Sequence, residues 1–303
     1  MAHGEHGHGH RHDAHGHGHT HAHGHGHGLA NGEDEELSFA APRPGDQKRI
    51  ELVWPFVREQ LAGLGPGSVL EIGCGVLGGF VPLLRAEGHR AVGVDPEAPE
   101  GPGFVRSRYE DYKPDADELP YDAVVACLSL HHVEDLDALL ASVAAQVRPG
   151  GLLVLREWAR EEFDEATACW CFDRLPEEAL GADENADENA EGDADENAEG
   201  DADEDPAART PAWWLAGHRQ GWQESGGSWD DYFQGWAEGH GLLSGAAMLD
   251  ALERSAFETV LLERDPYFHT ALVDVTADEE RAAVDAGVIR ANGLRYVGRR
   301  RSG

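Results

Sequence analysis

Basic residues and long apolar runs are scarce in this sequence of 303 residues, and each scarcity excludes a class of function. Its 24 Lys and Arg stand against 58 Asp and Glu, and the formal net charge of −34 argues against binding the phosphate backbone of nucleic acids. No apolar run is long enough to cross a membrane, and we find no secretory signal pattern. We therefore expect neither a nucleic acid nor a membrane as a partner.

Cysteine is scarce as well, with four residues in the whole chain. Two of them, Cys169 and Cys171, are separated by a single residue, whereas metal-binding and redox motifs usually place two residues between their cysteines. This usage favours a reduced, cytoplasmic protein over a disulfide-bonded secreted one.

Two segments of low complexity carry much of the histidine and of the negative charge. Residues 1–28 hold twelve of the 18 histidines, mostly alternating with glycine, and residues 177–205 hold fifteen Asp or Glu with no Lys or Arg. Neither segment has the apolar residues to build a core, so we expect both to be disordered. The alternating imidazoles predict weak binding of divalent metals by the N-terminal tail, or, in a sharper interpretation, metal storage.

The most informative stretch runs from Val69 to Pro96. It reads as a buried strand, a tight glycine turn, a helix and a second buried strand that ends on Asp95, which is the first half of a nucleotide-binding α/β domain. Gly73 and Gly75 allow the backbone to turn sharply and to approach a ligand closely. Asp95 is placed to accept hydrogen bonds from both hydroxyls of a ribose.

Two classes of cofactor compete for this stretch. Gly73, Gly75 and Gly78 fit G-x-G-x-x-G, the pattern of a dinucleotide-binding oxidoreductase. Glu71 argues against that interpretation, because a carboxylate at the end of the first strand would repel a pyrophosphate and would suit a cationic ligand.

With Glu71 included, the turn resembles the E-x-G-x-G signature of class I S-adenosyl-methionine-dependent methyltransferases, in particular the methyltransferase type 11 or UbiE-like small-molecule group. Residues 121–133 are similar to the fourth strand of that family and the turn after it, and residues 139–155 to its next helix, R-P-G-G turn and fifth strand. The resemblance implies an α/β fold: a Rossmann-like, doubly wound sheet of seven strands with an antiparallel edge strand. It also implies S-adenosyl-L-methionine as the cofactor. The third glycine of the family pattern is replaced by Leu77.

The resemblance also assigns residues to the cofactor. Glu110 would accept a hydrogen bond from the adenine amino group, with Tyr109 or Tyr112 stacking nearby. The full set of expected cofactor-binding residues is Glu71, Gly73, Cys74, Gly75, Asp95, Glu110 and Leu128.

Two residues are candidates for catalysis, because they follow strands at the edge of the sheet where ligands bind. His131 follows the fourth strand and could act as a general base, since an unperturbed imidazole titrates near neutrality. Glu157 follows the fifth strand and could be the base itself or could orient His131. The neighbouring His132 is expected to cap the next helix.

Aromatic residues are concentrated after the acidic segment. Trp214, His218 and Trp222 share one face of a predicted helix, and Trp229, Tyr232, Phe233 and Trp236 share one face of another, which Ser228 caps. Two such helices form a lid over the carboxyl edge of the sheet, and their tryptophan and tyrosine side chains favour a small, apolar or aromatic acceptor. The predicted organisation is a disordered tail (1–45), a cofactor-binding core (46–160), a disordered acidic insertion (177–205), a helical lid (206–241) and the C-terminal part of the fold (242–300).

The sequence therefore predicts a cytoplasmic enzyme that transfers a methyl group from S-adenosyl-L-methionine to a small molecule. Such an enzyme must align the acceptor with an already activated methyl group, and needs no metal in its core. Two alternatives stay open: an NAD-dependent oxidoreductase, and a metal-binding protein on a methyltransferase scaffold that has lost activity.

Overall fold

The computed structural model describes residues 44–115, 118–176 and 212–302, and it is built around one sheet of seven strands. The disordered segments expected at 1–45 and 177–205 lie outside the described residues, apart from the first two residues of a helix. The strands are β1 (Ser68–Ile72), β2 (Arg90–Asp95), β3 (Phe104–Arg106), β4 (Tyr121–Cys127), β5 (Val147–Trp158), β6 (Phe257–Asp265) and β7 (Gly293–Arg300).

The strand order is β3-β2-β1-β4-β5-β7-β6, which confirms the predicted seven-stranded, doubly wound arrangement. Strands β1 to β5 run parallel, and β7 runs antiparallel to both of its neighbours, β5 and β6. The antiparallel strand thus lies one place inside the edge, and β6 at the edge points the same way as β5. The segments after β1, β2, β4, β5 and β6 consequently meet at one edge of the sheet, where ligands bind in folds of this kind.

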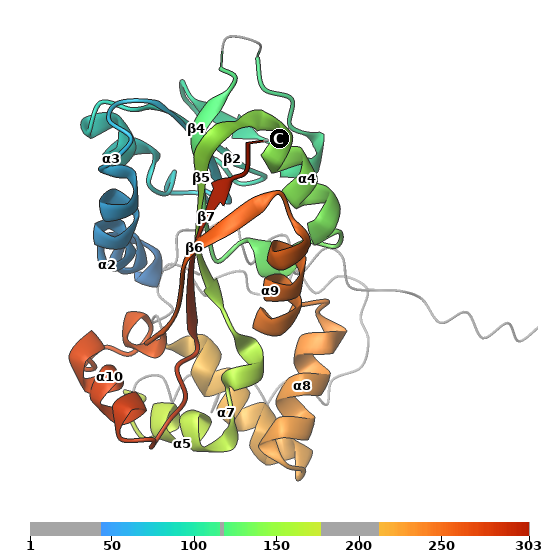
Figure 1. The fold of residues 1–303 in the computed structure, drawn as a ribbon. Coiled ribbons are helices and arrows are strands. Elements are labelled where there is room, and N and C mark those ends of the chain that lie inside the picture. Colours follow the sequence, from blue (N-terminus) through green and yellow to red (C-terminus); the bar gives the residue numbers. More distant parts are fainter. Residues whose placement is uncertain (1–43, 116–117, 177–211, 303) are drawn as a thin grey trace, which may run out of the picture.

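Helices cover both faces of the sheet and gather beyond its carboxyl edge (Figure 1). They are α2 (Pro44–Leu61), α3 (Val81–Ala86), α4 (Leu136–Gln146), α5 (Glu165–Phe172), α7 (Trp213–Ser225), α8 (Trp229–Gly239), α9 (Gly245–Arg254) and α10 (Ala277–Asp285). Short 3-10 turns are η1 (Tyr109–Asp111), η2 (Leu130–His132), η3 (Arg160–Glu162) and η5 (Phe268–Thr270). Figure 1 shows α2 and α3 on one side of the sheet, α4 and α9 on the other, and the remaining labelled helices beyond its end.

Alternating side chains of the strands supply the two cores. In β5, Leu152 and Val154 pack in the cluster that includes residues of α2 and α3, whereas Leu153 and Leu155 pack in the cluster with α4 and α9. Successive residues of a strand point to opposite faces, so a sheet covered on both sides needs this continuous apolar run.

Most helix starts follow the local signals in the sequence. Ser228, Ser244 and Thr276 cap α8, α9 and α10 through their side chains, and Thr276 forms a full capping box with Glu279. One prediction was wrong: α4 is capped by Asp135, whose carboxylate accepts a hydrogen bond from the Ala138 amide, and His132 lies in η2 instead. A carboxylate is a far better acceptor for a helix amide, and η2 separates the histidine from the helix.

The predicted lid helices exist as α7 and α8, and their aromatic faces belong to a third cluster. Trp229 and Phe233 are completely buried there, and their rings stack at 5.1 Å. The cluster also takes in α5 and the 268–289 segment, so α7 and α8 share it with other parts of the chain. Burying large aromatic side chains is the main stabilising contribution available to helices that contact few strands.

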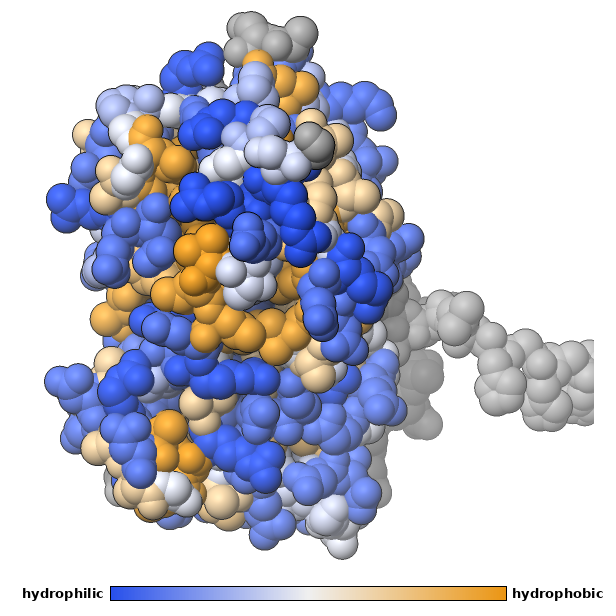
Figure 2. Space-filling model, viewed as in Figure 1, coloured by the Kyte–Doolittle hydropathy of each residue, from blue (hydrophilic) through white to orange (hydrophobic). Residues whose placement is uncertain are grey.

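The surface around β6 carries apolar side chains. Figure 2 shows them in the middle of a largely hydrophilic face, and Val260 and Leu262 of β6 are 53% and 49% exposed. The pairing of β6 with β7 shifts register between Thr259 and Leu261. This irregularity and the adjacent Glu263 make β6 a poor template for further strands. Within the described ranges no helix is both long and apolar enough to span a membrane.

Candidate active site

The turn between β1 and α3 contains the first group of predicted residues. Gly73, Gly75, Gly78 and Gly79 all have positive φ, at 79°, 62°, 78° and 54°. A Cβ on Gly73 would lie 2.4 Å from the Ser129 Cβ, so this glycine is required where the turn passes the end of β4. A Cβ on Gly75 would meet nothing within 4 Å, so this part of the turn borders open space.

The buried Glu71 side chain stabilises this turn through a hydrogen bond. Its side chain is 1% exposed, and its Oε2 accepts a hydrogen bond of 2.8 Å from the Phe80 amide at the start of α3. Burial raises the pKa of Glu71 to about 8, against the lowering effect of the Phe80 and Val81 amides. The prediction that a charge at Glu71 selects a cationic cofactor stays a prediction. The geometry shows Glu71 stabilising the glycine turn.

Asp95, at the end of β2, is brought directly to the turn. Its Oδ2 accepts a hydrogen bond of 2.9 Å from the Gly75 amide, and its Oδ1 one of 2.7 Å from the Glu97 amide. A carboxylate oxygen can accept two hydrogen bonds, so each oxygen keeps the capacity for one more donor. Because these oxygens can accept further hydrogen bonds and Gly75 borders open space, Asp95 suits the hydroxyl groups of the ribose of a nucleoside cofactor.

The segment after β4 is strained. Leu128 has φ at 55°, the one positive value among the described residues other than glycine, and its amide donates to the Arg156 carbonyl at 2.8 Å. A branched side chain in this region costs on the order of 1–2 kcal/mol. Such strain persists where surrounding contacts enforce it, often at functional sites. Here it turns the chain so that Ser129 and His131 face the end of β5.

His131 and Glu157 form a buried pair. The His131 Nδ1 lies 2.8 Å from the Glu157 Oε2, and the Glu157 Oε1 accepts hydrogen bonds from the Ser129 and Leu130 amides at 3.0 and 2.8 Å. Burial alone would raise the pKa of Glu157, but the His131 side chain and the two amides hold it below its usual value. An ionised Glu157 accepts the Nδ1 proton, so the lone pair of a neutral His131 is on Nε2.

An aromatic wall that the sequence did not indicate stands beside this pair. The Trp158 ring lies edge-on to His131 at 6.4 Å and stacks on Tyr267 at 5.7 Å, with 10° between the planes. Tyr267 is the second residue after β6, which brings it to the same edge as the end of β5. We call Trp158 and Tyr267 the aromatic wall. The position of Trp158 at the end of a strand could have identified it from the sequence. Nothing in the local sequence could have identified Tyr267, because its location depends on the pairing of β6.

The charged side chain of Arg156 contacts the aromatic wall. The buried Arg156 donates to the Glu157 and Pro266 carbonyls at 3.0 and 2.7 Å, and its guanidinium lies 5.4 Å from the centre of the Tyr267 ring. Burial raises the pKa of Tyr267 to about 12, although Arg49 and Arg156 oppose the change. The Tyr267 hydroxyl therefore remains protonated and can donate a hydrogen bond.

Other predicted residues are placed differently. Tyr109 and Tyr112 are 7% and 9% exposed and pack in the core beneath α4, so the prediction that one of them stacks on adenine was wrong. Their hydroxyls bind Ser142 and Glu118 instead. Glu110 is exposed on η1, and the structure does not bring it into contact with the glycine turn.

Burial disfavours the thiolate form of the two cysteines near the site. Burial raises the pKa of Cys74, which lies in the glycine turn. It also raises the pKa of Cys127, at the end of β4, to about 12. A hollow of about 490 Å³ near Trp170 and Arg174 involves none of the candidate residues. In the part of the chain that the structure describes, no group of three or more His, Cys, Asp or Glu could hold a metal ion; the histidine-rich tail lies outside that part.

Comparison with known proteins gives a family match. The profile of a family described as a methyltransferase domain matches residues 40–198, which is more than half of the chain. The ubiquinone biosynthesis O-methyltransferase of Methylobacterium sp. (strain 4-46) is 37% identical over 112 residues, covering 32% of this chain and 42% of that protein. The chain thus spans less than half of the length of this relative.

Solved structures with a similar fold include two methyltransferases. The S-adenosylmethionine-dependent methyltransferase from Mesorhizobium loti is 20% identical, with a TM-score of 0.44 and coverage of 82% of this chain and 97% of that one. The N-methyltransferase NodS from Bradyrhizobium japonicum WM9, in complex with S-adenosyl-L-homocysteine, is 14% identical, with a TM-score of 0.42 and coverage of 90% and 95%.

Proposed function

The chain belongs to the methyltransferase domain family, and from this premise we propose that it transfers a methyl group from S-adenosyl-L-methionine to a hydroxyl of a small aromatic molecule. The observation that carries the proposal is the meeting of three groups at one edge of the sheet: the glycine turn with Asp95, the His131–Glu157 pair and the aromatic wall. A cytoplasmic location belongs to the same proposal and is supported by the four cysteines, all unpaired.

The cofactor supplies a methyl group on a positively charged sulfur, already activated for displacement. Asp95 would accept hydrogen bonds from the ribose, and the turn at Gly73 and Gly75 would let the backbone approach the rest of the molecule. Glu71 acts through the turn by holding the start of α3. Cys74 and Leu128 would border the cofactor with their backbone, and Glu110 would bind its adenine end from η1.

The acceptor lies against the aromatic wall. A flat ring can pack on Trp158 and Tyr267, and the Tyr267 hydroxyl can donate a hydrogen bond to an oxygen on that ring. His131 Nε2 takes the proton of the hydroxyl that is methylated, and Glu157 stabilises the imidazolium that forms. The acceptor oxygen would thereby lose its proton to this chain's own base, while the cofactor would supply the methyl group.

The curated relative, whose name describes an O-methyltransferase, supports oxygen as the atom that receives the methyl group. The experiment measures transfer from S-adenosyl-L-methionine labelled with ¹⁴C in its methyl group to a panel of phenols, with 3,4-dihydroxybenzoate as the first member. Transfer to a phenol and none to matched amines is the expected result. Transfer to amines alone, or to no member of either set, would contradict the proposal.

Glu157→Gln tests the role of the pair. The amide can still accept from the Ser129 or Leu130 amide, but its NH₂ group would meet His131 Nδ1 and force the proton onto Nε2, which removes the base. We expect kcat to fall about 100-fold or more, with the affinity for S-adenosyl-homocysteine within about twofold of wild type. Glu161→Gln is the control, because Glu161 is also near the end of β5 but binds the Gly245 and Ala246 amides at the start of α9. An equal loss of kcat in both variants would show that the pair only maintains the fold.

A further inference from the structure

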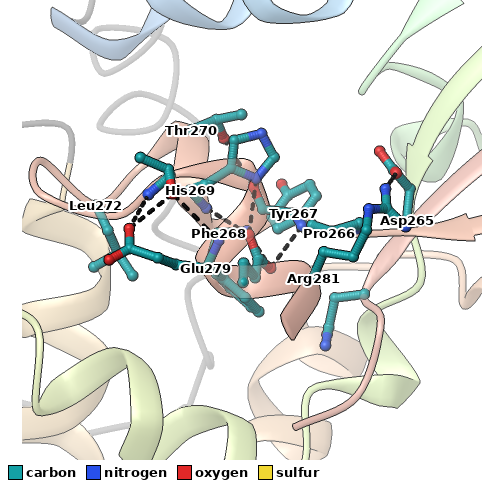
Figure 3. A network of polar contacts seen from close by, with 12 residues as sticks. Asp265, Pro266, Tyr267, Phe268, His269, Thr270, Leu272, Glu279 and Arg281 are labelled. Carbon is teal, nitrogen blue, oxygen red and sulfur yellow. Dashed lines mark hydrogen bonds and ion pairs between the residues drawn. The ribbon is translucent and has the colours of Figure 1, made fainter. Parts of the chain in front are cut away.

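The loop that carries Tyr267 is bound to helix α10 through three of its backbone amides. Glu280 of α10 is completely buried, and its carboxylate accepts hydrogen bonds from the amides of Tyr267, Phe268 and His269 at 2.7, 2.9 and 2.7 Å. It also binds the His269 Nδ1 at 2.8 Å. Figure 3 shows this loop with Tyr267, Phe268 and His269 around a network of hydrogen bonds. The amide side of the loop is thereby fixed to α10.

Side chains bind the carbonyl side of the same loop. Arg156 donates to the Pro266 carbonyl, the Thr270 hydroxyl donates to the Tyr267 carbonyl, and Lys48 binds two carbonyls further along the loop. The Lys48 Nζ donates to the His269 carbonyl at 2.9 Å and to the Leu272 carbonyl at 3.1 Å. Lys48 is in α2, 221 residues before His269 in the sequence, and it is partly buried in this contact. Hydrogen bonds from a charged donor are among the stronger ones in proteins, so this contact matters for where the loop lies.

The loop position decides the geometry of the aromatic wall. Tyr267 stacks on Trp158 at 5.7 Å, and Trp158 in turn lies edge-on to His131 at 6.4 Å. A shift of the loop by 1 Å would move Tyr267 from its place against Trp158, on which the proposed acceptor packs, and misplacements of that size are costly in catalysis.

We propose that Lys48 is a positioning residue for the acceptor: through the carbonyls of His269 and Leu272 it fixes Tyr267 against Trp158 and ties helix α2 to the aromatic wall. The proposal rests on the proposed function only in taking the aromatic wall as the place where the acceptor binds. Because Lys48 contacts the loop and not the glycine turn, its loss changes acceptor binding and leaves cofactor binding unchanged.

The chain offers a matched control. Its only two lysines are Lys48 and Lys113, and Lys113 is exposed beyond η1, away from the loop. Lys48→Met keeps the length of the side chain and removes the donor, Lys48→Arg keeps charge and donors, and Lys113→Met removes the other lysine.

The binding arm of the test uses 3,4-dihydroxybenzoate as the probe, with saturating S-adenosyl-homocysteine and tryptophan fluorescence as the signal. We expect Lys48→Met to weaken binding of the probe about tenfold and Lys48→Arg to restore most of it. Lys113→Met should have no effect, and the affinity for S-adenosyl-homocysteine should stay within about twofold in all variants. In a Tyr267→Ala background, Lys48→Met should cause no further weakening, because it acts through Tyr267.

A second arm needs no acceptor. The near-ultraviolet circular dichroism of the stacked Trp158 and Tyr267 should change in Lys48→Met and not in Lys113→Met, and the change should vanish in the Tyr267→Ala background. Reductive methylation with ¹³C-formaldehyde should modify Lys113 at least about tenfold faster than Lys48, whose ammonium is engaged.

Each arm has a result that overturns the proposal. Equal modification rates, an unchanged dichroism in Lys48→Met, or a weakening that persists without Tyr267 would show that Lys48 does not position the wall. If the probe fails to bind wild type while the dichroism and modification arms succeed, the acceptor class of the proposed function is wrong and the positioning role stands.

Discussion

Gly73 and Gly75 illustrate two distinct reasons for a glycine at a candidate site. Both have positive φ, but only at Gly73 does the chain lack room for a Cβ, because Ser129 at the end of β4 lies against it. The Ser129 hydroxyl donates to the Ile72 carbonyl at 3.0 Å and keeps the two strand ends together. The turn is therefore fixed at its start and open to a ligand two residues later.

This difference predicts unequal effects of alanine at the two positions. Gly75→Ala adds only the backbone strain of a left-handed residue, so we expect the free energy of unfolding to fall by about 1–2 kcal/mol. Gly73→Ala adds an overpacking cost of about 1–3 kcal/mol to the same strain. Urea unfolding of both variants measures the difference, and equal losses would contradict the packing described for Ser129.

Single residues also show what the sequence could predict about the site. Gly73, Gly75 and Asp95 were identified because they lie within one strand-turn-helix-strand unit, where local spacing determines which groups meet. Glu157 was identified by its place after a strand, and its orienting contact with His131 was one of the two roles considered. Tyr267 and Lys48 were missed as site residues, because their roles depend on contacts across more than a hundred positions in the sequence.

At the scale of elements, the lid helices α7 and α8 are joined through a buried histidine. The His218 Nδ1 lies 3.2 Å from the Tyr232 hydroxyl, and the His218 ring packs edge-on to Trp236 at 4.4 Å. Burial lowers the pKa of His218 to about 4, and His240 contributes to the change. The other groups that face this ring are aromatic: Trp214, Trp229 and Phe233.

His218 predicts a stability that depends on pH in a defined window. The folded pKa of about 4 is below the unfolded value of about 6.5, so below pH 6.5 the unfolded chain binds a proton that the folded lid does not. Stability due to this group is complete above pH 6.5 and decreases as the pH falls toward 4, by about 2 kcal/mol between pH 7 and pH 5.

The measurement is urea unfolding of wild type and His218→Phe at both pH values, since the larger ring keeps the aromatic packing without a titratable group. The difference in free energy of unfolding between the two proteins should change by about 2 kcal/mol in favour of the variant at pH 5. A difference that does not vary with pH would mean that His218 is accessible to protons in the folded lid.

Element boundaries followed the sequence closely where the signal was local. Ser228 caps α8, where the pattern predicted it. The lid was predicted as two amphipathic helices, but its cluster also needs Phe163, Phe172 and Phe268 from other segments. Amphipathic periodicity indicates which face is buried, and it carries no information about which distant segment covers that face.

For the whole molecule, the strand order places the ends of β1, β2, β4, β5 and β6 at one edge, with the lid cluster beyond it (Figure 1). The sheet thereby brings together a glycine turn, a carboxylate, a histidine–glutamate pair and an aromatic wall from segments up to 200 residues apart. The resemblance of the sequence to methyltransferases predicted a doubly wound sheet of seven strands with an antiparallel strand at its edge, whereas the antiparallel strand β7 lies one place inside the edge. The sequence did not predict the aromatic wall, because the wall forms only when β6 pairs with β7 and brings Tyr267 to the end of β5.

The central claim is that this edge binds S-adenosyl-L-methionine through the glycine turn and Asp95. Calorimetric titration with S-adenosyl-homocysteine tests it most directly, with Asp95→Ala as the variant, NADH as the competing ligand and thermal unfolding to verify the fold. We expect one binding site per chain for wild type, at least about tenfold weaker binding for Asp95→Ala and no binding of NADH. Binding of NADH in place of S-adenosyl-homocysteine, or equal affinity in the folded variant, would contradict it.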